Sequence, residues 1–206
     1  MHPLAASEAR ALLASDEHHR LGPLFTLAIA TGLRQGELLG LRWQDIDLHA
    51  GRLSVRHTLQ EGERTLADVK TERSKRTLRR GSAAVTALRE QRRRVLEARG
   101  AAGSRWQDGD FVFVAANGSP LDGRNVTHEL QAALRRAGLP RQRFHDLRHA
   151  FATLMLEAGE DLAIVSRSLG HATITTTADV YAHLTPAMQE RSAARMDTIL
   201  ANAAAG

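Results

Sequence analysis

Residues 31–43 read TGLRQGELLGLRW, and the predicted fold is built around this stretch. Its leucines and the final tryptophan can face a hydrophobic core, whereas Arg34 and Glu37 are three residues apart and share one face of a helix. A pair at this spacing is often a solvated ion pair. Here the glycine-rich start brings Arg34 in at a turn beside buried residues, which favours a functional position for it.

Outward from this stretch, the pattern predicts helices around a small sheet. A first helix spans residues 6–20, with Ser7 at its N-cap and Glu8 in its first turn. The other predicted helices span residues 22–31, 82–99, 124–137, 143–154 and 161–169, and a last one follows Pro186. Predicted strands span residues 52–59, 64–70, 75–79 and 111–114. The expected fold class is α+β, mainly α with a small antiparallel β-sheet of about three strands.

Composition narrows the class of protein. A chain of 206 residues can form one sizeable domain or two small ones. No apolar run approaches the ~20 residues of a membrane span, and the N-terminus lacks the pattern of a signal peptide. The chain has no cysteine, which excludes disulfides and a thiol nucleophile and fits a cytoplasmic protein.

Charge points to an anionic partner. The net charge is +5, the sequence pI is about 10.8, and among the 28 basic residues only Lys70 and Lys75 are lysines. A GC-rich genome explains most of the arginine excess, but it explains the net charge less well. Arginine suits phosphate recognition, and a basic domain suggests a nucleic-acid partner. Helix 82–99 carries a basic face that is either a solvated surface or a contact with the DNA backbone.

Two patterns could indicate a metal site. Asp45 and Asp47 form a D-x-D pair, but aspartates before a strand more often shape a turn. His145 and His149 share a helix face, as in a zinc pair, yet the glutamate of H-E-x-x-H is missing. Arg148 lies on that face and would repel a cation. The face therefore suits an anion better, and no metal site is predicted.

Residues 169–183 read LGHATITTTADVYAH and contain Tyr181, which is the only tyrosine. It stands in a polar run between His171 and His183. A phenol with a pKa of about 10 is a weak nucleophile until it is activated. Nearby arginines would stabilise its anion and a developing charge on a phosphodiester, and a neutral histidine could accept its proton. Lys70, at the tip of the second predicted hairpin, could protonate the leaving group.

Four motifs in this order resemble the tyrosine recombinase (phage integrase) family. They are TGLRQGEL (residues 31–38), Lys70-Thr71, HDLRH (residues 145–149), and LGH (residues 169–171) with Tyr181 ten residues after its histidine. The resemblance covers roughly residues 4–200 and implies the DNA breaking-rejoining fold of the family's catalytic core. The third strand departs from the family's usual Arg-Thr-Ile-Pro-Leu ending, because residues 76–80 read RTLRR. The sequence therefore does not decide how the chain passes from the third strand to the following helix.

The resemblance also implies a role for each matching residue. Arg34 and Arg148 would clamp the scissile phosphate, His145 would assist proton transfer, and His171 would hydrogen-bond a non-bridging oxygen. Lys70 would protonate the leaving 5′ oxygen, with Lys75 as the alternative, and Tyr181 would form a 3′-phosphotyrosyl intermediate. Glu37 and His149 would support them. No cofactor or metal ion is implied.

The expected partner is double-stranded DNA, with a tetramer on paired DNA sites, a monomer when free, and no membrane. Localisation would be cytoplasmic, in a bacterium or encoded by a phage. Residues 1–206 would form a single catalytic domain, with a core at about 4–185 and a C-terminal helix at about 186–200 that could dock on a neighbouring protomer. The N-terminal core-binding domain of the family is not expected, since about thirty residues precede Arg34.

Three other functions share parts of this pattern. A type IB topoisomerase uses closely similar chemistry but religates the same strand. An integrase remnant would bind DNA without cleaving it. A metal-dependent nuclease would need a carboxylate cluster that the motifs do not supply.

Overall fold

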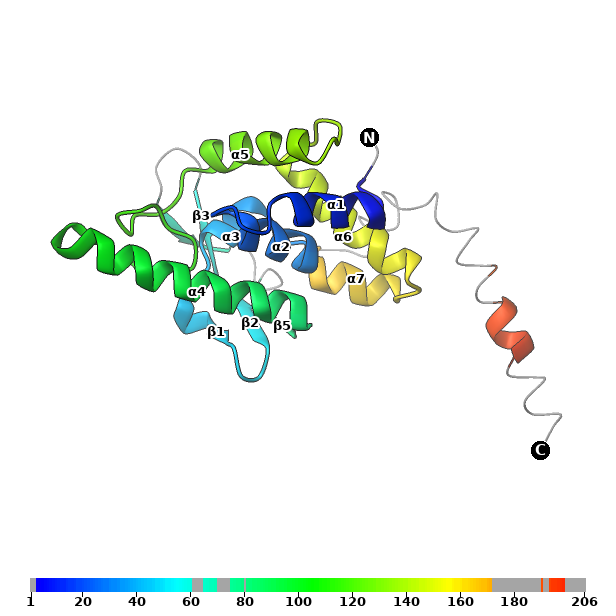
Figure 1. Ribbon diagram of the computed structural model, residues 1–206. Coiled ribbons are helices and arrows are strands. Elements are labelled where there is room, and N and C mark those ends of the chain that lie inside the picture. Colours follow the sequence, from blue (N-terminus) through cyan, green and yellow to red (C-terminus); the bar gives the residue numbers. More distant parts are fainter. Residues whose placement is uncertain are drawn as a thin grey trace.

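The computed structural model describes residues 3–60, 65–69, 75–79, 81–171, 190 and 193–198. Its helices are α1 Ala6–Ser15, α2 Gly22–Thr31, α3 Gln35–Leu39, η1 Trp43–Asp45, α4 Ser82–Ala102, η3 Gly103–Arg105, α5 Gly123–Arg136, α6 Phe144–Glu157 and α7 Leu162–Leu169. Its strands are β1 Ile46–Asp47, β2 Arg52–Val55, β3 His57–Leu59, β4 Leu66–Asp68 and β5 Arg76–Arg79. The predicted α+β class is confirmed, with most helices beside a small antiparallel sheet (Figure 1).

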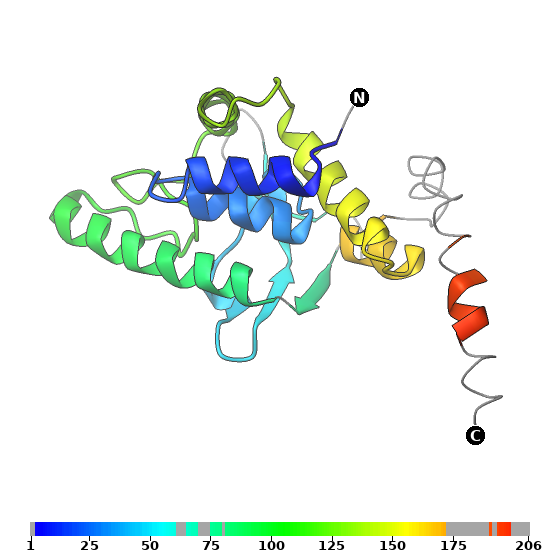
Figure 2. The same cartoon turned by 45° about the vertical axis from the view of Figure 1, so that its right-hand side comes forward.

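Helix α2 is the centre of the core. Eight of its ten residues are buried, and it packs against both α4 and α6. Pro23 lies in its first turn, where a missing N–H costs no helical hydrogen bond. Figures 1 and 2 show α1 and α2 between α4 and α5, with α6 and α7 gathered at one end. The first motif follows α2 directly, so it starts from the most buried helix.

The strands form two separate antiparallel units. Strand β2 lies between β1 and β5 in a three-stranded sheet, whereas β3 and β4 form a two-stranded ribbon. In the register, Val55 pairs with Arg76, and His57 pairs with Asp68. The predicted strand at 52–59 is therefore broken at Arg56, where the chain changes pairing partner. The predicted strands at 64–70 and 75–79 are both present, but shorter.

Two helix predictions need correction. The first helix ends at Ser15 and not near residue 20, because a turn follows in which His19 N–H donates to the Asp16 carbonyl at 3.0 Å. Its N-cap is Ala5 and not Ser7; the Glu8 carboxylate accepts from the Ala5 N–H at 2.8 Å. On helix α4, Leu96 is 61% exposed. The inner face of this helix is made instead by small alanines with Leu88 and Gln91.

The predicted strand at 111–114 is also wrong. Only isolated bridges join Phe111 to Arg42 and Val114 to Pro120. Proline has no N–H to extend such a ladder. Val112 and Phe113 are nevertheless buried, and a turn follows at Asn117-Gly118, with Gly118 at a φ of 83°.

The C-terminal part follows the prediction where it is described. Asp161 caps α7, accepting from the Ala163 N–H at 2.7 Å, and Gly170 ends this helix with a left-handed φ of 69°. Residues 193–198 are helical, as expected after Pro186. Within the described part of the chain, no helix has both the length and the apolar composition needed to cross a membrane.

Candidate functional site

Helix α6 carries the HDLRH motif in its first turns. The Asp146 carboxylate accepts from the Arg143 N–H at 2.7 Å, which satisfies one of the unpaired donors at the helix start. His145 and His149 stack edge to face with ring centroids 4.9 Å apart. The predicted common face of the motif is therefore present, and Arg148 lies on its buried side.

Arg148 joins three motifs. Its side chain is buried, with the residue only 3% exposed, and its two terminal nitrogens donate to the Gly32 and Leu169 carbonyls, each at 2.8 Å. Gly32 has a φ of 63°, and a Cβ there would lie 2.5 Å from the Phe151 ring. Glycine is therefore required where the first motif packs against α6. Through these contacts the TGLR, HDLRH and LGH stretches meet at one guanidinium.

Arg34 stands at the edge of this cluster. It is the N-cap of α3, and its backbone N–H donates to the Glu37 carboxylate at 3.0 Å. Its side chain donates to the same carboxylate at 2.8 Å while 42% of it stays exposed. The predicted pair is thus confirmed, but it is not a simple surface pair, because Glu37 is buried.

Glu37 has a second partner that the sequence did not suggest. Arg76 of β5 donates to both of its carboxylate oxygens, at 2.9 and 3.3 Å. Burial alone would raise the pKa of Glu37. The hydrogen bond and charge of Arg76, with those of Arg34, outweigh burial and lower the pKa below its ordinary value of 4.5. Glu37 is therefore a carboxylate that holds two arginines.

The histidines of the site are held neutral. Burial, followed by the charges of Arg148 and Arg34, lowers the pKa of His171 to about 4. Burial is also the first cause that lowers the pKa of His145 and of His149. Arg34 contributes to the shift of His145 and of His171, which places these groups within reach of each other. Neutral imidazoles can accept a proton at physiological pH.

The structure thus brings together six of the eight predicted residues: Arg34, Glu37, His145, Arg148, His149 and His171. Lys70, Tyr181 and the neighbouring His183 lie outside the described residues. The alternative lysine, Lys75, lines an open groove of about 490 Å³ beside β5. Arg76 is the residue that sequence reasoning missed. Its only signal was its place in the strand after the hairpin, because a long-range partner of Glu37 leaves no local pattern.

The aspartate pair and the histidine pair that could indicate a metal site have different surroundings in the structure. Asp47 accepts from the His49 and Ala50 N–H groups at 3.0 and 2.8 Å, so it shapes the turn as expected. Over the described ranges, no three histidine or acidic side chains are placed to hold a metal ion. The positive surroundings of His145 and His149 favour an anion on this face.

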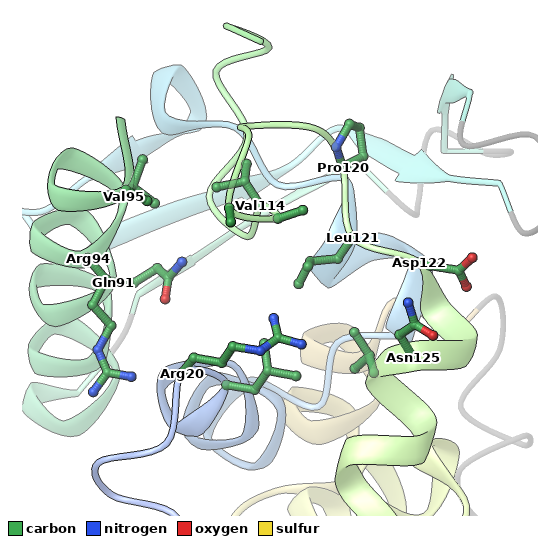
Figure 3. A pocket seen from close by; sticks show the side chains of 14 residues that line it. Arg20, Gln91, Arg94, Val95, Val114, Pro120, Leu121, Asp122 and Asn125 are labelled. Atoms are coloured by element: carbon green, nitrogen blue, oxygen red, sulfur yellow. The ribbon is translucent and has the colours of Figure 1, made fainter. Parts of the chain in front are cut away.

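A pocket lies elsewhere. It has a volume of about 440 Å³ and is bounded by α4, α5, the turn before α2 and the loop before α5, and Figure 3 shows Arg20, Gln91 and Asn125 at its wall. No described residue of the predicted site lines it.

The basic face of α4 is largely occupied by its own neighbours. Arg93 bridges Glu90 and Glu97, and Arg94 also bonds Glu90. Hydrogen bonds from Arg93 and then Arg94 lower the pKa of Glu90 to about 2. Arg92 lies over the Trp43 ring at 5.7 Å. These contacts favour the interpretation of this helix as a solvated charged surface.

Comparison with known proteins agrees with this arrangement. The Phage integrase family matches residues 3–188. A "Tyrosine recombinase XerC-like" protein of Caldanaerobacter subterraneus subsp. tengcongensis is 38% identical over 182 residues, which cover 82% of this chain and 46% of the relative. The ICEBs1 integrase of Bacillus subtilis is 29% identical, covering 85% of this chain and 48% of the relative.

Solved structures show the same fold. The XerA recombinase matches with a TM-score of 0.75 and 25% identity, covering 95% of this chain and 64% of that one. The Tn1549 transposon integrase, in complex with circular intermediate DNA, matches with a TM-score of 0.80 and 20% identity over 95% of this chain and 66% of that one.

A cluster of arginines and histidines on a mainly helical core fits the catalytic domain of a tyrosine recombinase. The chain belongs to the phage integrase family. It spans about half the length of the curated relatives it matches.

Proposed function

We propose that this chain breaks and rejoins DNA strands in site-specific recombination, without a metal ion, through a phosphotyrosyl intermediate at Tyr181. The observation that carries the proposal is the meeting of three motifs at Arg148, which joins Gly32 and Leu169. These contacts bring two arginines and neutral histidines close together, which supports the binding of a phosphodiester. The family relationship supports the same activity.

In the proposed reaction, the Tyr181 oxygen attacks the scissile phosphorus and the bond to the 5′ oxygen breaks. The phenolic proton passes to neutral His145, and Lys70 gives a proton to the 5′ oxygen as it leaves. Arg34 and Arg148 neutralise the charge that grows on the non-bridging oxygens, and His171 donates a hydrogen bond there. The phosphotyrosyl bond conserves the energy of the broken bond, so a second 5′ hydroxyl can reverse the attack without ATP.

The test uses negatively supercoiled plasmid in EDTA, because relaxation requires no knowledge of the target site. Samples stopped with detergent are expected to contain relaxed topoisomers and protein attached covalently to DNA. Tyr181→Phe should give neither product. Glu90→Gln on α4, purified in the same way, is the control variant and should give both products. Equal trapping by Tyr181→Phe, or a strict need for magnesium, would contradict the proposal.

We also propose that the partner is double-stranded DNA. The protein would be a monomer in the absence of DNA and a tetramer on paired DNA sites. Solved relatives include the XerH recombinase bound to a palindromic difH substrate, with 24% identity and a TM-score of 0.66. In this chain Met196 is exposed on the helical residues 193–198, where it could contact a neighbouring protomer. A truncation at residue 186 that assembles normally on DNA would count against this docking role.

A further inference from the structure

Arg76 holds two parts of the site at once. Its side chain is only 7% exposed. While Nη1 and Nη2 bind Glu37, its Nε donates to the Ser168 carbonyl at 2.8 Å. Figure 2 shows β5 reaching toward α7. One planar group thus connects the helix that begins after Arg34 with the helix that ends before His171. A lysine, with a single ammonium, cannot reproduce this fork.

The end of α7 is held by two cations. Arg76 binds the carbonyl of Ser168 and Arg148 binds that of Leu169. The last carbonyls of a helix carry partial negative charge and lack helical partners, so cations stabilise them. The chain then turns at Gly170, where a Cβ would lie 2.8 Å from Nη1 of Arg76. This glycine lets the guanidinium approach closely.

His171 follows directly. Its backbone N–H donates to the Ser166 carbonyl at 3.1 Å, so its position depends on the same helix end. Arg34 depends on Arg76 in a different way. It shares the Oε1 oxygen of Glu37 with Nη1 of Arg76. Any shift of Arg76 therefore moves partners of both residues.

We propose that Arg76 is a positioning residue that sets the place of His171 through Ser168 and the direction of Arg34 through Glu37. The inference rests on the proposed function only for its effect on DNA cleavage. Arg76 acts through these partners, since its own guanidinium is buried against them.

The first test is structural and needs no DNA. In Arg76→Lys, the ring signals of His171 in an NMR titration should move, and the pKa of His171 should rise from about 4 toward its ordinary 6.5. The reason is that a loosened α7 end admits water and draws the ring away from Arg148 and Arg34. Arg79→Lys, on the exposed end of the same strand, should change neither. A folded Arg76→Lys protein with unchanged His171 signals and pKa would overturn the proposal.

The second test measures plasmid relaxation in EDTA. Arg76→Lys should be slower by roughly 10- to 100-fold, as expected for misplaced reacting groups, while filter-binding affinity for the plasmid stays near that of the wild type. Glu37→Gln/Arg76→Met removes the buried charges together. Recovery of melting temperature without recovery of rate supports positioning. Recovery of both the melting temperature and the relaxation rate would show that Arg76 is only a counter-ion of Glu37. That result would overturn the positioning proposal. A wild type that relaxes nothing refutes the proposed function, whereas the NMR test still decides the positioning of His171.

Discussion

The arginines of α4 and those around the end of α7 have the same chemistry but opposite settings. Arg93 on α4 is 57% exposed and paired with carboxylates one turn away on its own helix. Arg76 and Arg148 are buried and bind carbonyls or a carboxylate from distant parts of the chain. Pairs in water contribute little because solvent and salt screen them. Buried pairs fix geometry, because leaving one partner alone is costly.

The difference teaches that a basic helix does not by itself locate this site. Helix α4 carries five arginines, yet they are largely satisfied on their own helix or by nearby groups. The site uses few arginines, each attached to a different motif. Substitutions in the two regions should therefore differ greatly in effect.

Arg148→Lys should have the largest effect. Relaxation of plasmid should slow by roughly 100- to 1000-fold, because a positioned donor to the developing charge is lost. Stability should also fall, since the buried Gly32 and Leu169 carbonyls lose their partners at about 1–3 kcal/mol each. Relaxation assays and urea unfolding measure the two effects. Near-normal activity and stability would remove the distinction between the regions.

Glu37→Gln should come next, with a loss of about 3–5 kcal/mol in the free energy of unfolding at pH 7, because buried Arg76 loses its counter-charge. The folded pKa of Glu37 lies below 4.5, so its contribution is complete above that pH. It is lost as the pH falls through the folded pKa. Urea unfolding between pH 7 and 3 should therefore give a flatter profile in the variant. A variant whose pH profile matches that of the wild type would show that Glu37 does not cause the loss of stability at low pH.

The matched comparison is Glu90→Gln on α4. The pKa of Glu90 is also lowered, to about 2, by Arg93 and Arg94. Because this group is at the surface, raising the salt concentration should remove most of the difference between Glu90→Gln and the wild type. The loss in Glu37→Gln should persist in salt.

Arg93→Ala should have the smallest effect. The melting temperature should not change measurably, and relaxation should stay within about twofold of the wild-type rate, since exposed ion pairs contribute little. The salt dependence of DNA binding should also keep its slope. A slope reduced by about one would instead identify Arg93 as a phosphate contact and revive the DNA-binding interpretation of α4.

Local sequence signals predicted much of the fold. Helices α2 and α7 were predicted at residues 22–31 and 161–169, close to their observed bounds. Errors occurred where a distant partner decided the local structure. Arg56 breaks a strand because β2 and β3 pair with different strands, and Pro120 limits the pairing of residues 111–114.

The site was predicted in the same uneven way. The i,i+3 spacing of Arg34 and Glu37 predicted their contact, and the helical spacing of His145 and His149 predicted theirs. The role of Lys70 and of Tyr181 stays a prediction. Arg76 could not be recognised as a partner of Glu37, because 39 residues separate them along the chain.

The sequence by itself determined which side chains are available for phosphate chemistry and which of them share a helix face, since both follow from residue type and helical period. Only the tertiary structure decided that Arg148 is anchored to Gly32 and Leu169, and that Arg76 holds Glu37 and the end of α7. The physical reason is burial. A charged group enclosed by the core must find its partners in space, and these partners come from whichever segments the packing brings together.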